Sequence, residues 1–182
     1  MIRLFVSVEL GEDVRNRLWQ MCCDVPGARW TEPDQMHLTL RFIGEVEGHV
    51  FEDIRGALNR VHADAFEISL RGVGHFPPRG QPRVLWAGIE RSEELLQLQR
   101  RVESTLVQLG LPPERRRFSP HVTLARLNGT PARAVGSYIA QHGLFRAGPI
   151  PVESFFLYSS QLGAKHAVHR EEAEYPLPLP GA

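Results

Sequence analysis

The chain has 182 residues, of which 42% are hydrophobic and 23% charged, a composition typical of one globular protein. Its 21 basic and 21 acidic residues give a formal net charge of zero, which argues against a general nucleic-acid coat protein. No apolar run approaches the roughly 18 residues that span a membrane, and the opening MIRLFVSVEL is too short and acidic for a signal peptide. Adjacent cysteines rarely bridge each other, so Cys22 and Cys23 predict free thiols and a cytoplasmic protein.

Hydrophobic periodicity predicts the elements in chain order. Strands are expected where apolar and polar residues alternate, or where β-branched and aromatic residues cluster between glycines and prolines. Helices are expected where apolar residues recur every three or four positions. The predicted strands are 4–10, 28–31, 37–43, 66–73, 84–89, 121–127, 152–159 and 168–175, and the predicted helices are 12–23, 47–61, 92–109 and 131–141. The segment GHFPPRGQPR, rich in proline and glycine, is expected to be a surface loop.

The order strand, helix, strand, helix, strand occurs twice, which indicates an internal duplication of roughly 80 residues. We therefore predict an α+β fold with two pseudo-symmetric lobes, approximately 1–80 and 81–182, and helices outside antiparallel sheets. No linker-like segment separates the lobes, so residues 1–182 are expected to form one domain. Equivalent residues of the two lobes should face each other across a central cleft.

Each half of the chain carries the same short motif: HLTL begins at His37, and HVTL begins at His121. In a strand, residues i and i+2 point to the same face. His37 and Thr39 therefore share one face, as do His121 and Thr123, while the leucine and valine residues between them face the core. One His-x-Thr is weak evidence of function, but two in matching strands predict a site with two imidazoles and two hydroxyls.

Two imidazoles suit general acid–base catalysis near neutral pH, one charged and one neutral. Hydroxyl groups beside them suit hydrogen bonds to phosphate oxygens, as an in-line displacement at phosphorus requires. The sequence contains no G-x-S-x-G for an activated serine, and no His-x-x-x-His or Cys-x-x-Cys supplies the further ligands of a zinc site. We therefore expect no metal and no other cofactor.

Three more residues are candidates for the site. Arg41 lies two positions beyond Thr39, so regular alternation places it on the histidine face, where it could bind phosphate. Arg126 lies three positions beyond Thr123 and needs a β-bulge to reach that face. Tyr158 is a candidate for stacking on the terminal base, whereas the pattern places Phe42 and Trp86 in the core.

Taken together, the motifs HLTL and HVTL, with RLFVSVEL, RFIGEV, PPRGQPRVLWAGIE, FSPHVTLAR and FFLYSS, resemble the 2H phosphoesterase superfamily. Within it, nearly the whole chain resembles the RNA 2′,3′-cyclic phosphodiesterases of the LigT/ThpR type, also called 2′-5′ RNA ligases. The resemblance implies the LigT-like fold and metal-independent hydrolysis of an RNA 2′,3′-cyclic phosphate to a 2′-phosphomonoester. It also implies that His37 is the proton donor and His121 the proton acceptor, with Thr39 and Thr123 holding phosphate oxygens. The near symmetry of the two motifs does not by itself assign the two roles.

Several alternatives stay open at this point. The enzyme could hydrolyse another small cyclic nucleotide phosphate, act as a 2′-5′ RNA ligase, or be a metal-dependent phosphodiesterase. A module that binds RNA ends without turnover is the alternative outside enzymes. The expected partners are RNA ends or small cyclic nucleotides, with no membrane, and the expected oligomeric state is a monomer.

Overall fold

The computed structural model describes residues 1–181 as one antiparallel sheet of nine strands with four α-helices and two short 3₁₀ turns. The strands are β1 (Ile2–Val8), β2 (Ala28–Trp30), β3 (Leu38–Val46), β4 (Phe66–Phe76), β5 (Val84–Ile89), β6 (His121–Leu127), β7 (Arg146–Val152), β8 (Ser154–Leu162) and β9 (Ala167–Pro176). The helices are α1 (Glu12–Trp19), α2 (Gly48–Ala57), α3 (Glu93–Leu109) and α4 (Ala132–His142), and the 3₁₀ turns are η1 (Pro33–Gln35) and η2 (Leu58–Arg60).

The strand order of the sheet is symmetric about its centre. It runs β7-β4-β5-β6-β3-β1-β8-β9, with β2 paired to β6. The two strands that carry the His-x-Thr motifs, β6 and β3, are therefore neighbours in the middle. On this pattern β5 is equivalent to β1, β4 to β8 and β7 to β9, which is the pseudo-twofold relation that the repeated motif predicts.

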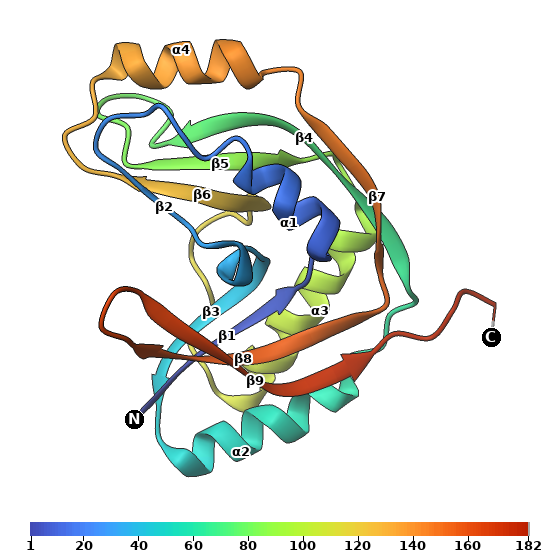
Figure 1. The fold of residues 1–182 in the computed structure, drawn as a ribbon. Coiled ribbons are helices and arrows are strands. Elements are labelled where there is room, and N and C mark those ends of the chain that lie inside the picture. The colour runs from blue at the N-terminus through green and yellow to red at the C-terminus, as the bar shows by residue number, and fades with distance from the viewer. Residues whose placement is uncertain (182) are drawn as a thin grey trace.

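The two halves of the sheet do not coincide with the two halves of the chain, so the predicted boundary near residue 80 is wrong as a division between lobes. Strand β4, from the first half of the chain, pairs with β5 and β7. Strands β8 and β9, from the last 30 residues, complete the half that contains β1 and β3. The chain therefore exchanges strands between the halves, and Figure 1 shows the two groups of strands meeting at an angle around the central pair.

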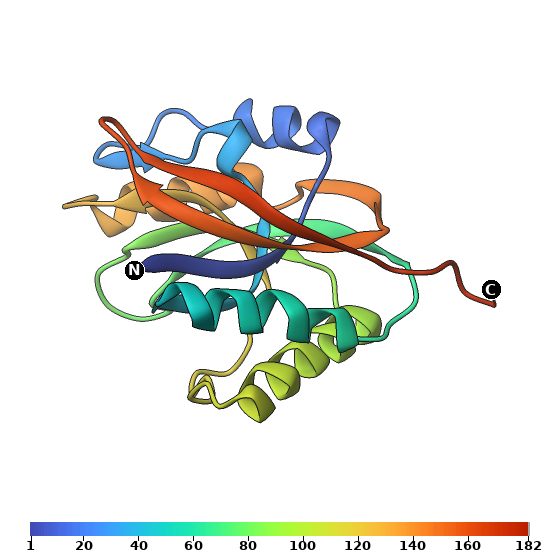
Figure 2. The same ribbon diagram turned by 90° about the horizontal axis from the view of Figure 1, so that it is seen from below.

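Helices lie outside the strands, as predicted. Helix α4 lies beyond the half that contains β4, and α2 lies beyond the other half, where it packs against α3 (Figures 1 and 2). One hydrophobic cluster includes side chains from both halves of the sheet and from all four helices. The helix predicted at 92–109 is confirmed with its cap, because the Ser92 hydroxyl accepts a hydrogen bond from the Leu95 amide at 3.1 Å.

The differences from the predicted elements occur at chain reversals. The helix predicted over 12–23 ends at Trp19, and the helix predicted over 47–61 ends as the 3₁₀ turn η2. The strand predicted at 152–159 is preceded by an additional strand, β7, which contains two prolines and so lacks a strand pattern in the sequence. As an edge strand, β7 tolerates prolines because one of its sides needs no ladder hydrogen bonds.

The lack of a side chain at Gly74 of β4 makes room for a large side chain of the neighbouring strand β5, that of Trp86. The indole of Trp86 lies against Gly74 of β4, where an added Cβ atom would stand 2.3 Å from Cζ2 of the ring. Trp86 is also opposite Thr123 of the second motif in the β5–β6 ladder. Trp86 is therefore half-buried beside the motif rather than in the core, and the absence of a side chain at Gly74 fixes where its ring can lie.

We expect Gly74→Ala to destabilise the protein by about 1–3 kcal/mol, because the new methyl group overlaps the Trp86 ring and backbone or ring must shift. Gly56→Ala is the matched control: Gly56 lies in α2, and its added Cβ meets nothing within 4 Å. That change should be neutral or stabilising by up to about 1 kcal/mol, since alanine is the better helix former. Urea unfolding of both variants measures the difference; equal stabilities would contradict the overlap.

Candidate active site

The central strands bring the two motifs together on one face of the sheet. Strands β3 and β6 pair through Leu38 opposite Val122, which are both fully buried. In an antiparallel ladder, the neighbouring positions then place His37 across from Thr123 and Thr39 across from His121. The two histidines occupy diagonal positions, for which side chains are about 7–8 Å apart in a regular ladder. The face that carries these four residues is called the motif face below.

The imidazole of His121 is oriented by the backbone. Its Nδ1 atom lies 2.7 Å from the carbonyl oxygen of Ser119, two residues earlier. When Nδ1 carries the proton, it donates to this carbonyl, so that Nε2 is left to exchange a proton with a ligand. The Phe76 ring contacts the His121 ring edge-on, with centroids 5.0 Å apart, and limits its rotation.

His37 lies in a more apolar environment than His121. Its ring stacks on Phe5 of β1 with centroids 4.8 Å apart and an interplanar angle of 18°. Burial, and after it the nearby His169 imidazole, lower the pKa of His37 to about 4, although a hydrogen bond with the Gln35 backbone opposes them. In the absence of a ligand, His37 is therefore uncharged at neutral pH.

A β-bulge in β3 reverses the faces expected for the residues after the first motif. Ser7 of β1 lies opposite Thr39, but Val6 lies opposite Arg41, so Leu40 is an additional residue in β3. Beyond the bulge, Arg41 points to the same side as the buried Val6, and Phe42 points to the motif face. The predicted position of Arg41 on the histidine face is thus wrong, and so is the predicted core position of Phe42, which is 59% exposed.

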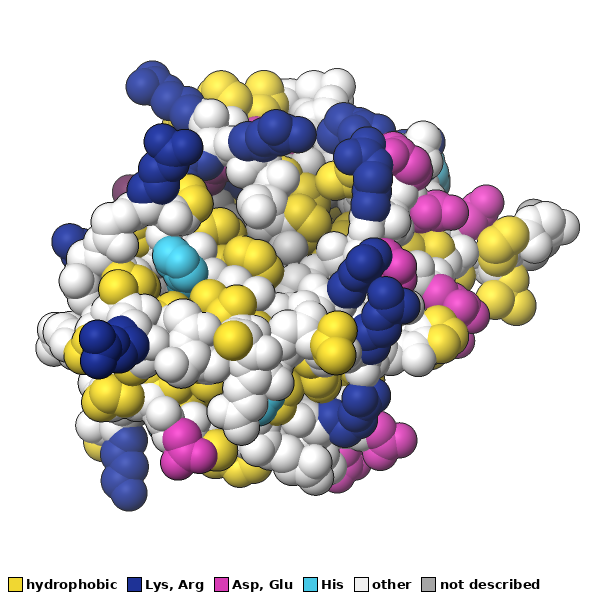
Figure 3. Space-filling model, turned by 90° about the horizontal axis from the view of Figure 1, so that it is seen from above, with side chains coloured by type: hydrophobic (Ala, Val, Ile, Leu, Met, Phe, Trp, Pro, Cys, Tyr) yellow, Lys and Arg dark blue, Asp and Glu magenta, His cyan; other side chains and the backbone are white. Residues whose placement is uncertain are grey.

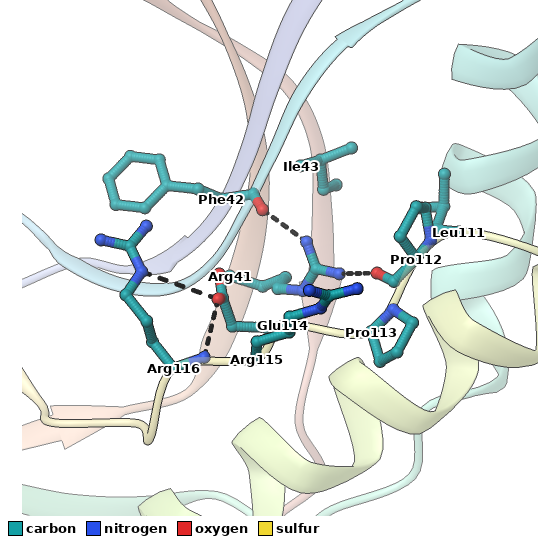
Figure 4. A pocket seen from close by; sticks show the side chains of 9 residues that line it. All are labelled: Arg41, Phe42, Ile43, Leu111, Pro112, Pro113, Glu114, Arg115 and Arg116. Carbon is teal, nitrogen blue, oxygen red and sulfur yellow. Dashed lines mark hydrogen bonds and ion pairs between the residues drawn. The ribbon is translucent and has the colours of Figure 1, made fainter.

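Arg41 is buried and its guanidinium is bound by groups of the protein itself. Only 7% of the residue is exposed, and its Nε donates to the Glu103 carboxylate of α3 at 2.5 Å. Its two terminal nitrogens donate to the carbonyl oxygens of Phe42 and Pro112, at 2.5 Å each. Figure 4 shows the guanidinium held against the segment 111–116, at the base of a cavity of about 400 Å³. These bonds tie β3 to α3 and to the chain that follows it.

The second motif contains the same bulge, and it brings Arg126 to the motif face. In the β5–β6 ladder Trp86 lies opposite Thr123 and Leu85 opposite Ala125, so Leu124 is the additional residue. Arg126 then lies on the same side as Thr123. The β-bulge that Arg126 needs in order to reach the histidine face is therefore present. Its side chain is exposed, and it takes no hydrogen bond or ion pair within residues 1–181. By position, Arg126 is the counterpart of Phe42, and Ala125 is the counterpart of Arg41.

Tyr158 lies on the motif face but is already packed on one side. Its ring stacks on Phe5, with centroids 5.4 Å apart, and its hydroxyl donates to the Glu9 carboxylate. Burial and then this hydrogen bond raise the pKa of Tyr158, so it stays a neutral phenol. Its strand, β8, occupies the place in the sheet that β4 occupies in the other half.

Besides Phe42, the motif face includes Ser7, Trp86 and His169, which were missed or misplaced from the sequence. Ser7 is directly opposite Thr39, is fully buried, and its hydroxyl has no hydrogen-bond partner within the described residues. Trp86 is directly opposite Thr123 in the other half, and its buried indole nitrogen has no partner there either. His169 of β9 contacts both Phe5 and His37 through its ring. Sequence repetition could have located Ser7 and Trp86 as equivalent positions, but His169 lies in no repeated motif.

Lys and Arg side chains lie around a hollow on the face seen in Figure 3, although the net charge of the chain is zero. Within residues 1–181, no three His, Cys, Asp or Glu side chains are grouped so that they could hold a metal ion.

In the same residues, no helix is long and apolar enough to cross a membrane. Both cysteines are free thiols, as predicted.

Comparison with known proteins gives the family. A sequence model of the 2′-5′ RNA ligase superfamily matches residues 14–163. The chain belongs to the 2′-5′ RNA ligase superfamily. Among its members, the RNA 2′,3′-cyclic phosphodiesterase of Aeropyrum pernix is 37% identical over 143 residues, which are 76% of this chain and 80% of that protein. The protein of the same name from Thermus thermophilus is 36% identical over 180 residues, 92% of this chain and 86% of the relative.

Solved structures of the superfamily agree with the fold. TT0787 of Thermus thermophilus superposes with a TM-score of 0.82 at 30% identity, and the match covers 98% of this chain and 99% of that chain. LigT of E. coli, solved with 3′-AMP, superposes with a TM-score of 0.77 at 23% identity over 97% of this chain and 98% of that chain. The predicted family and the predicted α+β, LigT-like fold are both confirmed.

We expect Arg41→Ala to lower the free energy of unfolding by about 3 kcal/mol, because it leaves the half-buried Glu103 carboxylate without its cation. Arg126→Ala is the control for loss of an arginine near the motifs, and it should leave stability unchanged because Arg126 is exposed and unbonded within residues 1–181. Urea unfolding of both variants is the measurement. If Arg41→Ala were as stable as the parent, the ion pair would not support β3 as described.

Proposed function

We propose that this protein hydrolyses RNA 2′,3′-cyclic phosphate ends to 2′-phosphomonoesters without a metal ion, with His37 and His121 as the general acid and base. The observation that carries the proposal is the placement of two imidazole–hydroxyl pairs across one antiparallel pairing, on one face of the sheet. The names of its relatives from Aeropyrum pernix and Thermus thermophilus support the choice of substrate class.

The proposed reaction is one displacement at phosphorus. Nε2 of His121 accepts a proton from water, the water oxygen forms a bond to phosphorus, and the bond from phosphorus to the 3′-oxygen breaks. His37 donates a proton to that 3′-oxygen, which leaves a 3′-hydroxyl and a 2′-phosphate. The diagonal placement of the histidines suits this step, because a separation of about 7–8 Å leaves the phosphate between a base and an acid on opposite sides.

The remaining residues of the motif face would bind the substrate. Thr39 and Thr123, each across from a histidine, are placed to donate hydrogen bonds to the non-bridging phosphate oxygens. Arg126, which the bulge turns to the motif face, is placed to neutralise their charge. For the terminal base, Tyr158 is the predicted stacking residue, and the exposed ring of Phe42 offers a second aromatic surface next to Phe5.

His37 must take up the proton that it donates when the substrate binds. Because burial, with the neighbouring His169, lowers the pKa of His37 to about 4, the residue is uncharged at neutral pH in the empty site. A phosphate anion within about 4–6 Å of an imidazole favours its charged form and raises its pKa. Substrate binding itself therefore prepares His37 as the acid, while His121 meets the attacking water.

A 2′-5′ RNA ligase activity would use the same groups with the 5′-hydroxyl of a second RNA in place of water: its oxygen forms a bond to phosphorus as the bond to the 3′-oxygen breaks, which leaves a 2′-5′ phosphodiester. This activity is the second candidate. An RNA-end-binding module without turnover is disfavoured because both histidines of the paired motifs are present. A monomer in the cytoplasm stays the expectation for the whole protein, and the two free thiols support the location.

The decisive assay uses an oligoribonucleotide that ends in a 2′,3′-cyclic phosphate, incubated with the protein in excess EDTA. We expect complete conversion to the 2′-phosphate, identified by its resistance to an enzyme specific for 3′-phosphates and by phosphorus NMR. A 3′-phosphate product would reverse the assigned leaving group. Loss of activity in EDTA and its return with a metal would replace the acid–base mechanism with a metal-dependent one.

His37→Ala and His121→Ala should each lower kcat by roughly 100-fold or more, because each removes one of the two proton transfers. His49→Ala is the control, since His49 is exposed at the start of α2 and should be replaceable without effect. Circular dichroism establishes that each variant is folded before its rate is measured. Full activity in either motif variant would mean that the site is elsewhere.

A further inference from the structure

A third imidazole lies in direct contact with the first motif. His169 of β9 is opposite Ser160 of β8, on the same side of the sheet as Tyr158. Its ring meets the ring of His37 edge-on, with centroids 5.3 Å apart and an interplanar angle of 69°. It meets Phe5 in the same way, with centroids 4.9 Å apart. Phe5 therefore contacts both imidazoles at once, and His169 lies beside the stacked pair of Phe5 and His37.

We propose that His169 is a positioning residue for His37: together with burial, it opposes a proton on His37 in the empty site, and a phosphate anion between the motifs relieves that opposition. This inference rests on the proposed function for its role in catalysis, but the contact between the two rings does not depend on it. The second motif lacks such a device within the described residues, because the ring that meets His121 edge-on is Phe76, which cannot be charged.

The physical reason is that two imidazolium ions about 5 Å apart repel each other. Both rings are partly buried, and burial is the largest cause that lowers the pKa of each, so a proton on either ring opposes a proton on the other. Once His169 is charged, protonation of His37 is opposed by burial and by this neighbour together. A phosphate anion between the motifs removes the opposition, since it attracts both protons.

Few other charged groups face this pair. Burial lowers the pKa of His169, the Asp34 carboxylate of η1 raises it, and His166 of the turn before β9 lowers it. The Glu9 carboxylate is bound to the Tyr158 hydroxyl, and the pKa of Glu171, two residues after His169 on β9, is raised by its own burial and by other carboxylates. Among the rings that contact His37 within residues 1–181, His169 is the one other imidazole.

The test compares His169→Gln and His169→Phe with the parent protein. Side-chain NMR of the ligand-free protein follows the titration of His37 from acidic to mildly alkaline pH, with its resonances assigned by their loss in His37→Ala. We expect a midpoint near 4 in the parent and a midpoint about one pH unit higher in both variants, the order expected for removing a like charge about 5 Å away. His166→Gln, which removes an exposed histidine without ring contact to His37, should leave the midpoint in place.

The two variants separate charge from packing. His169→Phe keeps an aromatic ring against Phe5 and His37, and His169→Gln does not. If only His169→Gln shifted the midpoint, His169 would act by excluding water, and the proposal would be overturned. An unchanged midpoint in both variants, or a parent midpoint at the ordinary value of histidine, would also overturn it.

Kinetics connect the shift to turnover. Because the pH profile of kcat/KM reports the free enzyme, its acidic limb should move to higher pH by the same amount in both His169 variants. If the protein failed to open a cyclic phosphate at all, the proposed function would be wrong, whereas the NMR midpoints would still decide whether His169 governs His37. If turnover were normal but the limb did not move, the role of His169 alone would be rejected.

Discussion

The pairing of Leu38 with Val122 is the interaction on which the rest of the site depends. It joins the two halves of the sheet through the strands that carry the motifs. Both residues are fully buried, so the register is fixed by the core and not by a ligand. A shift of either strand by one residue would turn its histidine to the core and its aliphatic residue to the motif face. The site is therefore preorganised by ordinary hydrophobic packing beneath it.

The paired bulges explain how similar motifs can present different chemistry. At the bulged position each strand turns the second residue after its Leu to the motif face, which is Phe42 in β3 and Arg126 in β6. One half of the site thus offers an apolar surface near Phe5, and the other offers an exposed guanidinium. Such an asymmetry suits a substrate with a base at one end and a charged phosphate at the other, although the backbone of the two motifs is nearly the same.

The repeated motif, the strand and helix order, and the α+β class could be predicted from the sequence because they depend on local periodicity. The faces of Arg41 and Phe42 could not, because a bulge appears only when the partner strand is known; Arg41 and Ala125 are equivalent in space but differ in kind. Trp86 was assigned to the core because its pattern is that of a buried strand, and the space left by Gly74 is not visible in one sequence. His169 reaches His37 through a long-range pairing in a strand exchanged between the halves.

The exchange of strands also sets the order in which a working site can form. The first motif appears early in the chain, but its half of the sheet is completed by β8 and β9, within residues 154–176. Phe5 needs Tyr158 and His169 beside it before His37 has its full environment. A nascent chain on the ribosome therefore exposes both His-x-Thr motifs well before it holds an assembled site. Newly made protein gains its capacity to act on RNA ends only after β9 has left the exit tunnel.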